Sequence, residues 1–115
     1  MNALNKLYDL ILWIVPVLEK YPKGQKYLVG DRIETMLLDV MELIVQAAYT
    51  RNKAPLLYSA NLKIETLRHL IRLSRDLKLI SVKKYEYASR ELNEVGAEIG
   101  GWLKYARGHQ RTGVA

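Results

Sequence analysis

Three arginines in the middle of the chain could bind phosphate or carboxylate groups. Arg68, Arg72 and Arg75 follow one another at spacings of four and three residues, which places all three on one face of a helix. The planar guanidinium group donates paired hydrogen bonds that match the oxygens of phosphates and carboxylates. The spacing therefore predicts a binding face for an anionic partner.

Further basic residues surround these arginines. Residues 51–84 contain nine lysines and arginines but only two acidic residues, Glu65 and Asp76. Each acid stands three or four residues from an arginine, so a solvated face with local ion pairs is one alternative to partner binding. Two carboxylates cannot neutralise nine cations, and the surplus favours a polyanion or an acidic protein surface. The candidate binding residues are Arg68, Arg72, Arg75, Lys63, Lys78, Lys83 and Lys84.

Patterns typical of catalysis or metal binding are weak. The sequence has no cysteine, no glycine-rich phosphate loop and no GxSxG motif. A metal site in a helical bundle would use Glu-x-x-His pairs, whereas Glu65 and His69 are four residues apart and have no second pair. We therefore expect no catalytic residue, no metal site and no cofactor, and we do not expect an enzyme.

A second group of residues indicates close packing. Gly96, Gly100 and Gly101 fall within the stretch GAEIGGWLK, where each glycine should weaken a helix by about 1 kcal/mol relative to alanine. The apolar spacing continues through all three glycines, so we do not expect the helix to end there. A smooth strip of small residues beside Trp102 favours a close helix contact, either within one chain or between subunits.

Helices must position all of these residues. Pro16 should kink the first helix or shift its last turn, and Ser81 is a suitable N-cap for the last helix. Short connections and the absence of a strand pattern predict an all-α fold, an antiparallel up-down-up-down four-helix bundle. We expect one domain over residues 1–107 and a flexible tail over 108–115. The expected helices span about residues 4–18, 26–50, 56–78 and 81–107.

The absence of cysteine and the hydropathy pattern favour a cytoplasmic protein, and the chain is basic. The formal net charge is +6 at pH 7. The longest apolar run, residues 10–18, is interrupted by Pro16 and is shorter than the roughly 20 residues that a membrane span needs. It follows Asp9 instead of a basic segment, so we do not expect a signal peptide. We therefore expect a cytoplasmic location and no membrane partner.

Three stretches resemble a known family. They are LYDLILWIVPVLEKYPKGQKYLVGDRIE (7–34), AAYTRNKAPLLYSANLKIETLRHLIRLSRDLKLIS (47–81) and YEYASRELNEVGAEIGGWLK (85–104). In order and spacing these stretches are similar to the accessory variability determinant (Avd) proteins, the four-helix-bundle subunits of bacterial and phage diversity-generating retroelements. The resemblance covers nearly the whole chain, and it is most specific at YPKGQKYLVGDRI, LRHLIRLSRDL and GGWLK.

The resemblance implies a barrel-like pentamer with a positively charged surface and no known active site. Such proteins bind a reverse transcriptase and its template RNA, and a DNA strand or an RNA–DNA hybrid is a related possibility. They support the copying of a template repeat into adenine-mutagenised cDNA. By position, Arg68 and Arg72 match the family's helix-three arginines. The proteins encoded within intervening sequences of ribosomal RNA genes share this fold and assembly, and they are the alternative.

Overall fold

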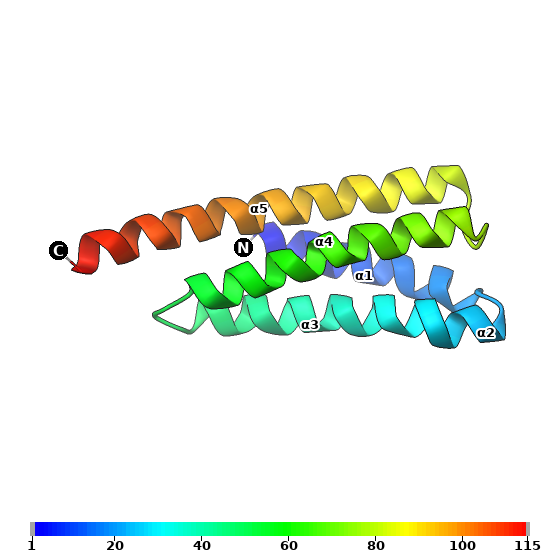
Figure 1. The fold of residues 1–115 in the computed structure, drawn as a ribbon, viewed down its shortest axis with the longest axis horizontal. Helices are drawn as coiled ribbons and strands as arrows, with labels where there is room; N and C mark the ends of the chain where they lie inside the picture. The colour runs from blue at the N-terminus through cyan, green and yellow to red at the C-terminus, as the bar shows by residue number, and fades with distance from the viewer. Residues whose placement is uncertain (1, 115) are drawn as a thin grey trace.

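The computed structural model describes residues 2–114, and it describes side chains through residue 109. This part of the chain is helical and contains no strand (Figure 1). Two short elements, α2 (Lys23–Gln25) and the π-helix η1 (Lys26–Gly30), join the first two long helices. The expected all-α class is confirmed, whereas the pentamer stays a prediction. The four long helices are α1 (Asn2–Glu19), α3 (Asp31–Ala48), α4 (Ala54–Asp76) and α5 (Val82–Val114).

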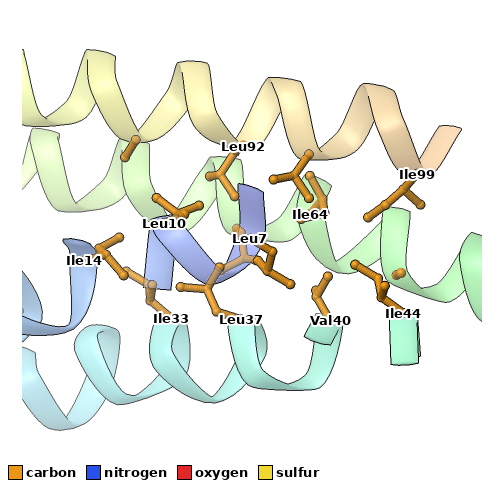
Figure 2. Close-up of a cluster of buried hydrophobic side chains, with 14 of the residues drawn as sticks. Leu7, Leu10, Ile14, Ile33, Leu37, Val40, Ile44, Ile64, Leu92 and Ile99 are labelled. Atoms are coloured by element: carbon orange, nitrogen blue, oxygen red, sulfur yellow. The ribbon is translucent and has the colours of Figure 1, made fainter. Parts of the chain in front are cut away.

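The long helices alternate in direction and form an elongated bundle (Figure 1), 54 Å along its longest axis. Each one packs against two others, because α4 contacts α3 and α5 while α1 contacts the same two helices. Apolar residues three and four positions apart therefore face a common axis. Figure 2 shows part of this core, in which the labelled side chains are Leu7, Leu10, Ile14, Ile33, Leu37, Val40, Ile44, Ile64, Leu92 and Ile99.

Helix α1 contains Pro16 one turn before its end. The chain leaves the helix through two short-range hydrogen bonds between residues three positions apart. Lys20 N–H donates to the carbonyl of Val17 at 3.2 Å. Tyr21 N–H donates to the carbonyl of Leu18 at 3.1 Å. Bonds of this kind tighten the last turn of a helix and satisfy carbonyls that would otherwise lack a partner.

Tyr21 attaches the connection between α1 and α3 to helix α4. Its side chain is buried, and a Cβ atom on Gly30 would lie 3.5 Å from its Cδ2 atom. Burial raises the pKa of the Tyr21 phenol, and a hydrogen bond with Ser74 offsets part of the rise. Ser74 is fully buried and donates to the carbonyl of Leu70 at 3.0 Å. The connection is therefore fixed to α4 by a buried polar contact.

The π-helix η1 replaces the α-helical start that the sequence predicts near residue 26. A π-helical turn contains more residues than an α-helical turn. The side chains of α3 therefore start at a different angle around the helix axis than they would in a continuous α-helix. Val29 and Gly30 are buried, whereas Tyr27 and Leu28 have exposed fractions of 64% and 79%. The turn thus presents one aromatic and one aliphatic side chain to solvent at the end of the bundle.

The turn between α4 and α5 follows the Schellman pattern. Lys78 N–H donates to the Arg75 carbonyl at 2.9 Å, and Leu79 N–H donates to the Ser74 carbonyl at 2.8 Å. Lys78 itself has a φ of 61°, the left-handed conformation that usually selects glycine at this position. Ser81 Oγ then accepts the backbone N–H of Lys84 at 3.2 Å, which confirms the expected N-cap.

Helix α5 passes through its glycines without a break, as the apolar spacing predicts. It also continues past residue 107, where we placed the end of the domain, and remains helical to Val114. The segment 108–114 therefore differs from the expected tail in backbone conformation. Its flexibility stays a prediction, and the side chains of residues 110–115 lie outside the described part of the structure.

Candidate nucleic-acid interface

The three arginines of α4 are engaged in local ion pairs. Arg68 Nη1 lies 2.6 Å from a carboxylate oxygen of Glu65. Arg75 Nη2 lies 2.8 Å from Asp76 Oδ1, and Arg72 Nε lies 3.9 Å from Asp76 Oδ2. The two local pairs expected from the spacing, Glu65 with Arg68 and Arg72 with Asp76, are therefore present. Three guanidinium groups share two carboxylates, so the face keeps a small positive surplus.

Arg68 also takes part in helix packing. Its side chain lies against Gly96 of α5, where an added Cβ atom would be 2.9 Å from Nη2. Its Nε atom is buried and has no hydrogen-bond partner among the described residues. A shallow groove next to it is lined by residues of both helices, including Tyr58, Asn61 and Arg107. Arg68 is thus partly committed to the interface between α4 and α5.

Arg75 contacts α5 through an aromatic ring. Its guanidinium carbon lies 4.4 Å from the ring centroid of Tyr85, within the range of a cation–π contact. Arg75 donates hydrogen bonds to the Asp76 carboxylate, and these raise the pKa of the Arg75 guanidinium, so the group stays charged throughout the accessible pH range. Arg72 is the most exposed of the three, with 62% of its side chain accessible. Of the arginine face, Arg72 is the residue best placed to meet a partner.

Lys63 lies apart from the arginines. Its Nζ atom is 3.9 Å from Asp39 Oδ2 on α3, whereas the side chains of Arg68 and Arg75 contact α5. Lys63 stands five positions before Arg68 on α4, which turns it to another side of the helix. A role for Lys63 in binding stays a prediction.

A set of exposed lysines gathers at one end of the bundle, which we name the lysine end. Lys78, Lys83 and Lys84, which the sequence analysis proposed, lie in the α4–α5 turn and the first turn of α5. Sequence reasoning missed Lys20 and Lys23, which lie in the α1–α3 connection at the same end (Figure 1). Their signal is the basic run KYPKGQK. The lysine end comprises Lys20, Lys23, Lys78, Lys83 and Lys84, all of them exposed.

The glycines of α5 separate into different environments. Gly96 is buried against α4, and a Cβ atom on Gly100 would lie 3.5 Å from Asn61 Nδ2, an ordinary contact distance. Nothing lies within 4 Å of the position that a Cβ on Gly101 would occupy. Gly96 therefore serves close packing within one chain. A subunit contact at Gly100, Gly101 or Trp102 stays a prediction.

Gly101 and Trp102 border a hollow between α5 and the start of α1. Its other lining residues are Ala3, Ala97 and Glu98. The Nζ atom of Lys53 lies 5.8 Å from the Trp102 ring centroid. Lys53 also donates to backbone carbonyls near the end of α3 at 2.8 and 2.7 Å, so this lysine serves the fold.

Neither metal-binding clusters nor membrane-spanning helices occur in the described part of the chain. No group of three or more histidine, cysteine, aspartate or glutamate side chains there is arranged to hold a metal ion. No described helix combines the length and apolar character needed to cross a bilayer. The most distinctive surface of these residues is the basic one.

The fold and this surface define a class: an elongated antiparallel four-helix bundle with positive charge concentrated on α4 and at one end. Comparison with protein families then gives a specific assignment. The family model described as bAvd-like matches residues 1–106. The chain belongs to the bAvd-like family, and its family is of the accessory, non-catalytic Avd type. A search of curated proteins returned no match.

Proposed function

We propose that this protein is the accessory subunit of a diversity-generating retroelement and binds its reverse transcriptase and template RNA. Its role is to bring the two together and support mutagenic cDNA synthesis in the cytoplasm, without catalysing a reaction itself. The observation that carries the proposal is membership in the bAvd-like family over residues 1–106. The excess of basic over acidic residues between positions 51 and 84 supports an anionic partner.

The distribution of charge also supports this proposal. Helix α3 carries a single basic residue, Arg32, beside several acidic ones, so its exposed face differs in sign from that of α4. An RNA strand approaching the bundle would be attracted to α4 and the lysine end and repelled from α3. The acidic residues of α3 are Asp31, Glu34, Asp39 and Glu42.

A homo-oligomer, with a pentamer as the expected form, is part of the proposal. Apolar side chains remain exposed on α1 and α3, two helices that contact each other. Covering such side chains in a subunit interface would remove them from water. Sedimentation at micromolar concentration tests this part, and a 13.3 kDa monomer would contradict it. The exposed apolar residues are Tyr8, Leu12, Leu38 and Val45.

Co-purification tests the two partners separately. The tagged protein is expressed with the reverse transcriptase and template region encoded beside its gene, and captured with and without nuclease. We expect the polymerase in both samples and the template RNA only in the untreated one. Capture of neither partner would overturn the proposal. A gene located inside a ribosomal RNA operon, with no reverse transcriptase nearby, would instead favour the intervening-sequence class.

A further inference from the structure

The two parts of the basic surface differ in how much of their charge is free. In the described side chains, none of the lysines at the lysine end has a carboxylate within 4.0 Å. Two of the acids at this end are paired with other cations, since Glu19 pairs with Lys26 at 2.7 Å and Asp76 pairs with two arginines. Glu86, which follows Lys83 and Lys84 in α5, forms no ion pair with them within 4.0 Å. The lysine end therefore offers unneutralised charge, whereas each α4 arginine has a carboxylate within 4.0 Å and the side chains of Arg68 and Arg75 also pack against α5.

Several residues at the lysine end are unfavourable for the fold itself. Lys78 adopts a left-handed conformation with φ 61°, which disfavours any residue with a side chain. Lys83 and Lys84 stand in the first turn of α5, which has no acidic residue, although cations near a helix N-terminus are destabilising. Selection for stability alone would place glycine and acidic residues here. Residues that go against these local preferences, with no gain in stability, indicate a functional site.

An exposed aromatic side chain lies in the same connection as Lys20 and Lys23. The π-helical turn η1 presents Tyr27 with 64% of its surface exposed, between the α1–α3 lysines and helix α3. Exposed aromatic rings provide surfaces on which unpaired bases stack, and nearby cations follow the phosphate backbone. The combination of flexible lysines and one free ring suits a single strand better than a duplex, whose bases are already stacked.

We infer that the lysine end, together with Tyr27, is the surface that binds single-stranded RNA. Lysines from the two connections contact successive phosphates, and the Tyr27 ring stacks on one base. The α4 arginines do not provide these phosphate contacts. This inference rests on the proposed function for the identity of the nucleic acid, but it assigns the RNA to a different part of the surface from the arginines that the family resemblance favours.

Salt-dependent binding measurements test the inference. The probe is a fluorescent oligouridylate, and its affinity is measured by anisotropy at several salt concentrations. Each phosphate contact to a single strand contributes roughly 0.7 to the slope of log affinity against log salt. Lys83→Ala/Lys84→Ala and Lys20→Ala/Lys23→Ala should each reduce the slope by about 1.4, which weakens binding about 25-fold at 0.1 M salt. Tyr27→Ala should weaken binding at least about 5-fold without changing the slope.

The matched control is Arg51→Ala/Lys104→Ala, which removes two exposed cations away from the lysine end. This control should leave the slope nearly unchanged. Equal losses in the control and the lysine variants would overturn the inference while leaving RNA binding, and so the proposed function, intact. Failure of the unmodified protein to bind any RNA would overturn both. Binding to phosphatidylserine vesicles but not to RNA would identify the surface as a membrane contact and overturn the inference.

Discussion

Arg68 and Gly96 form a single packing unit at the contact between α4 and α5. A Cβ atom on residue 96 would lie 2.9 Å from Arg68 Nη2 and 3.3 Å from Ile64 Cγ2. The guanidinium group therefore rests on a backbone that must lack a side chain. Arg68, which the family resemblance favours for partner contact, is also part of the interior, so a change at Arg68 perturbs packing and surface charge together.

Alanine substitutions at Gly96 and Gly101 should have different effects on stability, because of the two only Gly96 is packed against a neighbouring helix. Gly101→Ala should raise the free energy of unfolding by about 1 kcal/mol, because alanine favours helix and meets no nearby atom. Gly96→Ala should be less stable than Gly101→Ala by about 1–2 kcal/mol, because Arg68 and Ile64 must move. Urea denaturation measures both values. In an Arg68→Ala background, part of the cost at Gly96 should disappear, and an identical cost in both backgrounds would contradict the packing relationship.

Glycine at position 78 should stabilise the fold. Lys78→Gly removes the steric cost of the left-handed conformation and should raise the free energy of unfolding by about 1 kcal/mol. Lys78→Ala is the matched control, since it removes the same charge but keeps the strain. Chemical denaturation should show no comparable gain for the alanine variant. If both variants gained equally, charge and not backbone conformation would be the cause.

Glu91 should make stability depend on pH. Burial raises the pKa of Glu91, and the neighbouring Glu94 carboxylate raises it further. The folded protein therefore holds this proton more tightly than the unfolded chain does, and stability falls as pH rises through the window between the two pKa values. Glu91→Gln should raise Tm at pH 7.

The advantage of Glu91→Gln should shrink as the pH falls through this window and disappear below the usual glutamate pKa of about 4.3, because the wild-type side chain is then neutral in both states. Thermal denaturation across a pH series measures this difference. Glu86→Gln, at an exposed position of the same helix, serves as the control. A gain from Glu91→Gln that stayed constant at every pH would argue against a titration effect.

Arg72→Ala should test the arginine face without disturbing the fold. Arg72 is largely exposed, and its ion pair with Asp76 is long at 3.9 Å, so its loss should change stability by less than about 0.5 kcal/mol. If the arginine face binds the reverse transcriptase, capture of the polymerase should fall several-fold. Arg90→Ala, exposed on α5, is the control. Unchanged capture by a folded Arg72→Ala protein would exclude this face as the contact.

Local periodicity explains which features could be predicted from the sequence. The long helices, the core positions, the Ser81 cap and the ion pairs of Arg68 and Arg72 all depend on neighbours within one or two turns. The lysine end could not be found that way, because chain reversal is needed to bring the α1–α3 and α4–α5 connections to the same end of the bundle. The π-helical turn was missed for a related reason, since an apolar period of 3.6 residues does not reveal a local change of winding.

The π-helical turn also has a consequence for how this chain tolerates change. In an α-helix each residue turns the side-chain direction by roughly 100° about the helix axis. The π-helical turn η1 contains one residue more than an α-helical turn would, between the buried Tyr21 and the first core position of α3. Removing a single residue from 26–30 would let α2 and α3 merge into one regular helix. The deletion would also rotate the α1–α3 connection relative to α3, which would move Tyr27 out of solvent and move Tyr21 away from Ser74. The number of residues in η1 therefore determines which side chains are exposed at this end of the bundle.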